Sequence, residues 1–337
     1  MKAVVLDGKS HALTIDKPAP ELSNGYALVK VMAAGICGTD IELLYHNPIQ
    51  TDIVPGHEVA GIVVQPGGSG AFNIGDRVFL NCHITCMECA HCQAGDYIFC
   101  KDLSVIGFDV DGGDADYIAV PEVNLRALPD DITFEQGVLL TDALGTPFHA
   151  AKKAEIKPGE FVGVSGVGPL GIMCILSVAH FGGIPVAIDV IEERLEVARR
   201  FGAAYTVNGK SDVQKEISAI TNGQGLDKVI DCSGNAAAIK ADLEMLKCRG
   251  TMVQVGVCSS ITLNLFDGLI SNEITLKGSR NFHDSEIPEM MELIRQSKQI
   301  NDIFTHRFSF DEAATAFELS EKREGLKIIL GPDEGSK

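Results

Sequence analysis

The sequence predicts an α/β protein built from a β-rich domain and a doubly wound parallel-sheet domain. The chain has 337 residues, which is more than one hydrophobic core usually organises. Short β runs broken by Gly, Pro and Asp occupy the first 150 residues, and from about residue 158 strands alternate with helices. A glycine-rich turn directly follows the first strand of this alternating part.

The β-rich part is predicted from short apolar runs with high β propensity. They read YALVKVMAAG (26–35), VAGIVV (59–64), DRVFL (76–80) and DYIAV (116–120). Turn-forming residues separate these runs, as in compact all-β domains.

The second part is predicted from apolar runs that alternate with amphipathic segments. The predicted strands are FVGVS (161–165), PVAID (185–189), AAYTV (203–207), KVIDCS (228–233), MVQVGV (252–257) and ITLKGS (274–279). The predicted helices are 169–181, 192–201, one from about 211, and 236–247. This alternation predicts a parallel sheet with helices on both faces, and six strands complete a doubly wound nucleotide-binding domain.

The end of the chain is predicted to return to the first domain. It contains a helix (286–296), a polar link, a second helix (311–321) and a strand (325–330). The expected domains are therefore residues 1–150 with 286–337, and residues 151–285.

The acidic composition excludes several kinds of partner. The formal net charge is −18, and both nucleic acids and anionic membranes require a basic face. No run of about 18 apolar residues and no apolar signal core is present. We therefore expect a cytoplasmic protein that binds a small, neutral or weakly charged molecule.

A cluster of four cysteines is typical of a structural zinc site. The spacing is C-x2-C-x2-C-x7-C, at Cys86, Cys89, Cys92 and Cys100. Four thiolates close one tetrahedral zinc and leave no position for a substrate. Unrelated buried cysteines are the alternative, and a nucleic-acid-binding zinc ribbon is disfavoured by the acidic surroundings.

The glycine-rich turn is typical of a dinucleotide-binding site. It comprises Gly166, Val167, Gly168, Pro169, Leu170 and Gly171, between a strand and an apolar helix. Gly166 permits the tight turn, Gly168 lets a pyrophosphate approach the backbone, and Gly171 lets helix and strand pack closely. The phosphates are expected at the helix N-terminus.

An acidic residue after the second strand favours NAD(H) over NADP(H). Asp189 ends the strand after the turn, where a carboxylate accepts hydrogen bonds from ribose hydroxyls and repels a 2′-phosphate. The next residues, Val190 and Ile191, offer no arginine. Arg194 is expected on the adenine side of the coenzyme or at the surface.

Three separated segments suggest a second metal site. They are Gly-Ile-Cys37-Gly-Thr39-Asp40, Gly56-His57-Glu58, and the segment from Thr141 and Asp142 to Thr146. A cysteine, a histidine and a carboxylate can bind zinc and leave one position open for chemistry. Each also has an ordinary structural explanation: a buried thiol at Cys37, a loop histidine at His57, and a helix cap at Asp142.

These motifs together resemble the zinc-containing medium-chain alcohol dehydrogenases along nearly the whole chain. The resemblance rests on the G-H-E-x2-G-x5-G run from Gly56 to Gly67, the four-cysteine lobe and the GVGPLG turn. It implies a GroES-like catalytic domain, residues 1–150 and 286–337, and a Rossmann NAD-binding domain, residues 151–285.

The resemblance implies a role for each residue of the catalytic site. Cys37, His57 and Asp142 would be ligands of the catalytic zinc, and Glu58 a close, exchanging ligand. Other branches of the family have a cysteine or a glutamate at the position of Asp142. An aspartate at this position resembles the bacterial secondary-alcohol branch. Asp40 would orient His57 through its other ring nitrogen.

Further positions match family residues that contact the substrate or the coenzyme. Thr39 matches the family residue whose hydroxyl contacts the substrate oxygen. Thr146 matches a family residue near the nicotinamide. The positions that match loops along the coenzyme are Cys232, Ser233, Val255, Gly256 and Ser279.

One position and one segment depart from the family pattern. The usual proton-relay histidine is Glu42 here, so Glu42, His46 or water remain candidates for the relay. The segment from Gly112 to Tyr117 reads GGDADY, whereas relatives often carry an aromatic residue and a glutamate in this segment. Glu42, His46 and Asp109 are polar candidates for the substrate pocket.

The sequence thus predicts an enzyme with two zinc ions per chain, one catalytic and one structural. It would transfer a hydride between NAD(H) and a secondary alcohol or ketone, with a polyol, sugar or cyclitol as the expected substrate. A simple secondary-alcohol dehydrogenase, a zinc-free reductase of the same fold and a non-catalytic NAD-binding protein are the alternatives. The resemblance also implies a homo-oligomer, a tetramer or a dimer.

Overall fold

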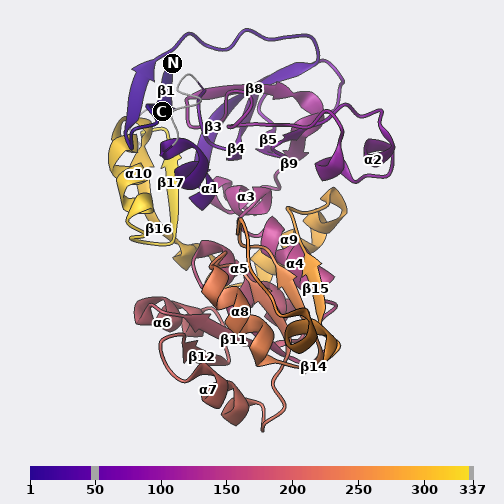
Figure 1. Cartoon of the computed structure of the whole chain (residues 1–337). Coiled ribbons are helices and arrows are strands. Elements are labelled where there is room, and N and C mark those ends of the chain that lie inside the picture. Colours follow the sequence, from indigo (N-terminus) through magenta and orange to yellow (C-terminus); the bar gives the residue numbers. More distant parts are fainter. Residues whose placement is uncertain (47–52, 334–337) are drawn as a thin grey trace. The chain divides into compact units, whose positions relative to one another are not determined.

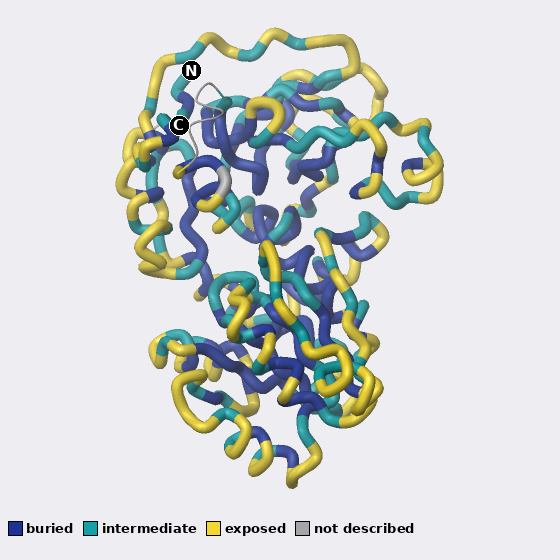
Figure 2. The backbone as a smooth tube through the Cα atoms, in the orientation of Figure 1, coloured by how far each residue is buried: buried dark blue, intermediate teal, exposed yellow. Residues whose placement is uncertain are grey.

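The computed structural model describes residues 1–46 and 53–333, which form two compact units (Figure 1). The first unit contains Met1–Asp142 and Asn301–Lys337, and the second contains Ala143–Ile300. Buried backbone is concentrated in the central strands of each unit (Figure 2). None of the helices in the described ranges is long and apolar enough to cross a membrane.

The first unit is organised by a mixed sheet with the strand order β16-β17-β3-β4-β5-β9, in which β8 also pairs with β3. Its strands are β3 (Tyr26–Ile36), β4 (Glu58–Gln65), β5 (Arg77–Leu80), β8 (Tyr117–Pro121), β9 (Leu125–Ala127), β16 (Phe304–Ser309) and β17 (Lys327–Gly331). Two short antiparallel pairs accompany it, β1 (Lys2–Leu6) with β2 (Ala12–Asp16), and β6 (His83–Ile84) with β7 (Ser104–Val105). Its helices are α1 (Gly38–Asp40), α2 (Ala90–Gln93), α3 (Phe134–Thr141) and α10 (Ala313–Glu321), and a π-helical turn spans Ile41–Tyr45.

The register of β3 positions the candidate site. Alternate residues of β3, including the fully buried Val29 and Val31, face the core. β3 runs antiparallel to both β4 and β17, and Gly35 pairs with Glu58 while Ile36 pairs with Ile328. The end of β3 therefore lies beside the beginnings of β4 and β17.

The second unit contains a six-stranded sheet in the order β12-β11-β10-β13-β14-β15, and all neighbouring strands are parallel. The strands are β10 (Phe161–Ser165), β11 (Ile184–Asp189), β12 (Tyr205–Asn208), β13 (Leu226–Asp231), β14 (Leu246–Gln254) and β15 (Thr275–Gly278). The helices are α4 (Gly145–Lys153), α5 (Pro169–His180), α6 (Glu192–Arg200), α7 (Val213–Ile220), α8 (Ala236–Met245) and α9 (Ile287–Gln296). The strand order reverses at β10, so a ligand crevice is expected at the carboxyl ends of β10 and its neighbours.

The structure differs from the sequence-based expectation in the last third of the chain. α9, expected on the first domain, contacts α4 and α5 of the second unit, because its apolar face (Ile287, Met290, Leu293 and Ile294) is buried there. The units accordingly divide at residues 142 and 300 rather than at the expected 150 and 285. The expected polar link contains β16, which pairs in parallel with β17.

Candidate active site and zinc-binding lobe

The four cysteines of the predicted structural site surround one point in the first unit. Their Sγ atoms all lie within 4.8 Å of one another. The Sγ atoms of Cys89 and Cys92 are 3.5 Å apart, and those of Cys86 and Cys100 are also 3.5 Å apart. The chain between them is compact because α2 begins at Ala90, directly after Cys89, and so brings Cys92 back toward Cys86.

The electrostatics of this lobe fit a cation. Hydrogen bonds from the backbone N–H groups of Cys92 and Lys101 lower the pKa of Cys89 to about 6, and the N–H of Cys86 lowers the pKa of Cys100. Burial instead raises the pKa of Cys92 to about 11. A divalent cation would stabilise all four thiolates at once.

A second group of potential ligands comes from three segments of the first unit. Cys37 follows β3, His57 and Glu58 lie at the start of β4, and Asp142 follows α3. Their ligand atoms all lie within 4.8 Å of one another. Oδ2 of Asp142 is 3.6 Å from Sγ of Cys37 and 3.7 Å from Nε2 of His57. The three predicted ligands and Glu58 are thus brought together.

The buried carboxylate of Asp40 fixes the orientation of His57. Oδ1 of Asp40 is 3.1 Å from Nδ1 of His57, and Oδ2 accepts a hydrogen bond from the backbone N–H of Cys37 at 2.9 Å. Burial opposes protonation of His57, but Asp40, Asp142 and Cys37 outweigh it and raise the pKa of His57 well above its ordinary value. This arrangement leaves Nε2 directed to the ligand cluster and favours a positive charge there.

Glu58 forms an ion pair with Lys327, a residue that the sequence analysis missed. The two side chains are 1% and 2% exposed, and Nζ of Lys327 also donates to the carbonyl oxygen of Ile36 at 3.2 Å. Burial raises the pKa of Glu58, and Lys327 acts in the opposite direction. A Cβ on Gly35 would lie 2.5 Å from Oε2 of Glu58, so glycine is required beside the pair. The sequence signal was a lysine inside the apolar run GLKIIL.

Of the residues considered for proton transfer, Thr39 lies at this group. Oγ1 of Thr39 is 3.5 Å from Sγ of Cys37, whereas Glu42 is exposed on the π-helical turn. His46 lies 2.9 Å from the hydroxyl of Ser10 and 3.3 Å from the carboxylate of Glu321. Both ring nitrogens of His46 are therefore engaged away from the ligand cluster.

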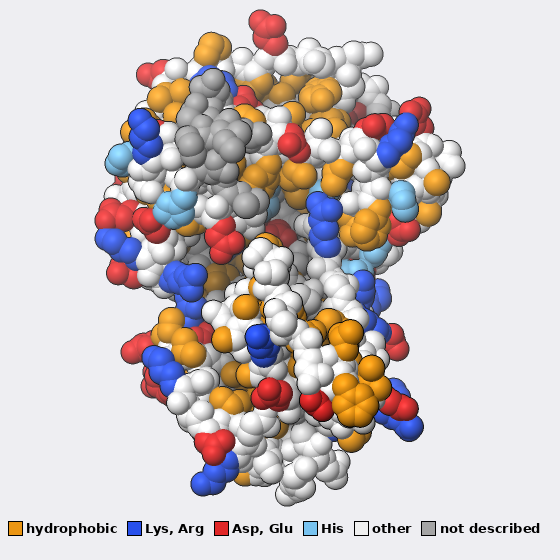
Figure 3. Space-filling view, viewed as in Figure 1, with side chains coloured by type: hydrophobic (Ala, Val, Ile, Leu, Met, Phe, Trp, Pro, Cys, Tyr) orange, Lys and Arg blue, Asp and Glu red, His pale blue; other side chains and the backbone are white. Residues whose placement is uncertain are grey.

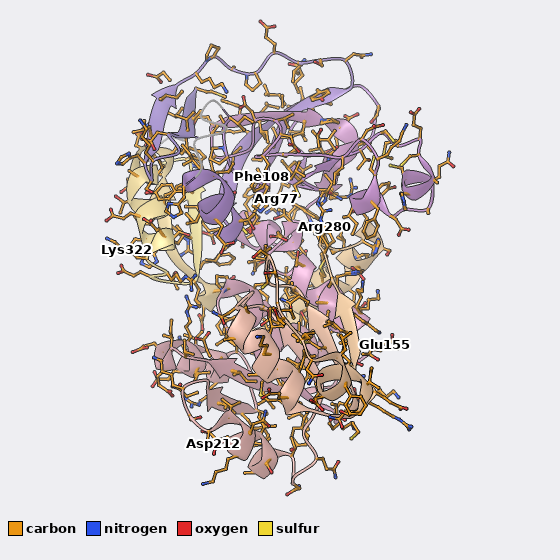
Figure 4. All side chains as sticks on the ribbon, viewed as in Figure 1. Arg77, Phe108, Glu155, Asp212, Arg280 and Lys322 are labelled. Atoms are coloured by element: carbon orange, nitrogen blue, oxygen red, sulfur yellow. The ribbon has the colours of Figure 1, made fainter. Side chains whose placement is uncertain are left out.

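Phe108 lies beside the ligand cluster, and Asp109 does not contribute a free carboxylate to it. The ring centroid of Phe108 (labelled in Figure 4) is 5.1 Å from that of His57. Oδ2 of Asp109 accepts a hydrogen bond from the backbone N–H of Val105 at 2.7 Å and so stabilises the turn. The aromatic ring gives this side of the site an apolar surface.

The departure at residues 112–117 places a buried acid behind His57. Asp114 is fully buried, and its carboxyl oxygens have no hydrogen-bond partner within the described ranges. A Cβ on Gly56 would lie 2.3 Å from Oδ1 of Asp114, so the glycine before His57 is required by this contact. Burial raises the pKa of Asp114 well above its ordinary value.

The glycine-rich turn in the second unit has the geometry of a dinucleotide fingerprint. Gly166 has φ of +82°, and a Cβ on Gly171 would lie 2.0 Å from the carbonyl oxygen of Gly166. Gly168 caps α5, and Pro169 is its first residue. Oδ2 of Asp189 accepts a hydrogen bond from the N–H of Val167 at 2.9 Å. The turn and the predicted ribose carboxylate are thus held together.

The other predicted coenzyme-binding residues of the second unit directly follow strands of its parallel sheet. Cys232 and Ser233 follow β13, Val255 and Gly256 follow β14, and Ser279 follows β15. Because carboxyl ends of parallel strands share one edge, these positions lie along the edge that carries the turn. Nη1 of Arg194 is 4.0 Å from Oδ2 of Asp189, and Thr146 lies on α4.

Comparison with known proteins agrees with both units. Residues 23–130 match the family model of the alcohol dehydrogenase GroES-like domain, and residues 169–296 match that of the zinc-binding dehydrogenases. Sorbitol dehydrogenase of Bacillus subtilis is 30% identical over 99% of this chain and 98% of its own length. L-threonine 3-dehydrogenase of Shewanella woodyi is 32% identical over 95% of this chain and 96% of its own length.

A solved structure shares the fold over the whole chain. Alcohol dehydrogenase TADH from Thermus sp. ATN1 superposes with a TM-score of 0.90 and 31% identity, covering 99% of this chain and all of that one. The predicted GroES-like and Rossmann architecture is confirmed by these matches. The chain belongs to the zinc-dependent medium-chain alcohol dehydrogenases, and it is an oxidoreductase that acts on CH–OH groups.

Proposed function

We propose that Cys37, His57 and Asp142 hold a catalytic zinc ion, with Glu58 within reach as an exchanging ligand. The observation that carries this proposal is the convergence of their ligand atoms within 4.8 Å of one another. Thiolate, imidazole and carboxylate are the donors of open zinc sites. The second zinc is proposed at the four cysteines of the lobe, where it supports the fold.

The residues of the site suit oxidation of a secondary alcohol. A zinc ion in the site would polarise the substrate oxygen and lower the pKa of the hydroxyl. We assign Thr39 to accept the hydroxyl proton, because its Oγ1 lies at the cluster beside Cys37. The exposed Glu42 carboxylate is proposed to pass that proton to solvent, a role that the engaged ring of His46 fits less well.

The coenzyme is proposed to be NAD(H). Asp189 ends β11 and is 8% exposed, and Val190 and Ile191 after it carry no positive charge to bind a 2′-phosphate. Arg194 is close to Asp189 and is proposed on the adenine side. The coenzyme-binding roles of Thr146 and of the residues after β13, β14 and β15 are proposed on the same basis.

The substrate is proposed to be a polyol, sugar or cyclitol. Support comes from the sorbitol dehydrogenase of Bacillus subtilis, which is similar over nearly the whole chain. Glu42, which is close in sequence to Cys37, carries an exposed carboxylate that suits a substrate with several hydroxyls. His46 and Asp109 are engaged elsewhere, so their expected place in the pocket has less support.

We also propose that the chain forms a homo-oligomer, a dimer or a tetramer, in the cytoplasm. Figure 3 shows hydrophobic side chains at the surface of the protein. In the second unit, the segment from residue 257 into edge strand β15 exposes several large hydrophobic side chains. They are Val257 (78%), Leu265 (61%), Phe266 (64%), Ile270 (63%) and Leu276 (43%). Apolar surface around an unpaired sheet edge is typical of an interface.

Turnover tests this proposal directly. The purified protein is incubated with NAD⁺ or NADP⁺ and with polyols, sugars, cyclitols and simple secondary alcohols, and absorbance of the reduced coenzyme is followed. We expect NAD⁺ reduction with a polyol and its loss in Cys37→Ala and Asp142→Ala. Full activity in either variant would contradict the ligand assignment, and preference for a simple alcohol would favour the alternative substrate class.

A further inference from the structure

A buried carboxylate at the end of β13 connects two loops of the second unit. Asp231 is the last residue of β13 and is fully buried. Its Oδ2 accepts a hydrogen bond from the hydroxyl of Ser233 at 2.6 Å, and its Oδ1 accepts one from the backbone N–H of Gly234 at 2.9 Å. Oδ1 also accepts a hydrogen bond from Nε2 of Gln254, the last residue of β14, at 2.7 Å. One carboxylate thus holds both loops.

The backbone completes the connection between the loops. The carbonyl oxygen of Asp231 accepts hydrogen bonds from the N–H groups of Val255 and Gly256 at 3.0 and 2.9 Å. The loops are in close contact, because a Cβ on Gly256 would lie 2.2 Å from the nitrogen of Gly234. Ser233 in turn packs on the glycine-rich turn, since a Cβ on Gly166 would lie 2.7 Å from Cα of Ser233.

A second buried carboxyl group lies against the first. Asp242 on α8 is 1% exposed and lies against the side chains of Asp231 and Ser165. Burial and the neighbouring Asp231 raise the pKa of Asp242 well above its ordinary value. The three hydrogen bonds that Asp231 receives come from Ser233, Gly234 and Gln254, so they do not depend on Asp242.

The position of these loops determines which part of the coenzyme they would meet. The ribose carboxylate Asp189 ends β11, and the pyrophosphate-binding turn follows β10. A dinucleotide lies across the crevice at the strand-order reversal, so its nicotinamide half extends to the β13 side of β10. The loops held by Asp231 lie on that side.

We propose that Asp231 is a positioning residue for NAD(H), because its carboxylate holds the loops after β13 and β14 in the conformation that receives the nicotinamide half. Asp242, the neighbouring buried acid on α8, is not assigned this role. This inference rests on the proposed function and adds a residue that does not itself contact the coenzyme. It predicts that the same isosteric change has a large effect on coenzyme binding at Asp231 and a small one at Asp242.

The test is NADH binding, followed by fluorescence titration, in Asp231→Asn and Asp242→Asn. An amide at 231 loses one of the two acceptor oxygens, so the Kd for NADH should rise about tenfold or more. An amide at 242 leaves the three hydrogen bonds to Asp231 in place, so its Kd should stay within about twofold of wild type. The KM for NAD⁺ should rise with the Kd, while the KM for the alcohol and the zinc content should not change.

A milder variant decides the question if Asp231→Asn does not fold. Gln254→Met removes one donor to Asp231 and should weaken NADH binding by about threefold or more. Unchanged NADH affinity in the folded variants would overturn this inference and leave the proposed function intact. A wild-type protein that binds no NADH would overturn the proposed coenzyme and this inference with it.

Discussion

Glu58 and Lys327 form an ion pair inside the first unit, directly behind the ligand cluster of Cys37, His57 and Asp142. The sequence separates these two residues widely, and β3 brings them together by pairing with β4 on one side and β17 on the other. The ammonium group of Lys327 balances one of the acidic groups of the cluster. It also gives Glu58 a partner when Glu58 does not bind a metal ion.

Lys327→Met should destabilise the protein by about 3–5 kcal/mol, because it leaves the Glu58 carboxylate buried without its partner. Urea unfolding of the metal-free protein measures this change. The double variant Glu58→Gln/Lys327→Met is the matched control, and it should recover most of the lost stability because both charges are removed. A single variant as stable as wild type would show that the pair does not stabilise this fold.

Asp40→Asn should weaken binding of the catalytic zinc by about 10–100-fold, because an amide holds His57 less firmly and makes it a weaker ligand. Competition with a chromophoric chelator measures the affinity. Asp109→Asn is the control, since Asp109 accepts a backbone hydrogen bond in a turn of the same unit. Equal zinc affinity of both variants would exclude the assigned role of Asp40.

Asp189→Ala should raise the KM for NAD⁺ about tenfold or more and narrow the preference for NAD⁺ over NADP⁺. The substitution removes the ribose acceptor, the repulsion of a 2′-phosphate and the hydrogen bond to Val167. Steady-state kinetics with both coenzymes measures the change, with the exposed Glu193→Ala on α6 as control. An unchanged ratio of kcat/KM values would contradict the assignment of Asp189.

The four-cysteine lobe should lose zinc in acid. The pKa of Cys89 is lowered to about 6, so its thiolate is present above this pH and is protonated as the pH falls through it. Bound zinc opposes this protonation and protons compete with zinc for the four thiolates, so zinc release to a chelator should increase as the pH falls from 7 to 5. Release that is independent of pH between 7 and 5 would contradict thiolate coordination by Cys89.

The sequence predicted the architecture of both domains because the short β runs of the first differ clearly from the strand–helix alternation of the second. The runs around β3 and β10 and the GVGPLG turn depend on local patterns, and the structure has them at the expected residues. α9 was placed on the wrong unit because an amphipathic helix shows that it has an apolar face but not which surface covers that face. β16 was missed because its alternation is short and interrupted by polar residues.

The site was predictable in its donors but not in their surroundings. Cys37, His57 and Asp142 belong to motifs, whereas the ion pair of Lys327 arises from strand pairing over long sequence separation. The engagement of His46 by Ser10 and Glu321 likewise depends on tertiary contacts. The link from Asp231 to Gln254 requires the parallel register of β13 and β14, which periodicity does not specify.

The zinc content of wild type, Cys37→Ala and Cys82→Ala tests the central claim most directly. Cys82 is a buried thiol of the same unit whose pKa burial raises to about 12, and it is not assigned as a ligand. Metal analysis should give two zinc ions per chain for wild type and Cys82→Ala, and one for Cys37→Ala. Two zinc ions in Cys37→Ala, or a single one in wild type, would contradict the catalytic zinc site.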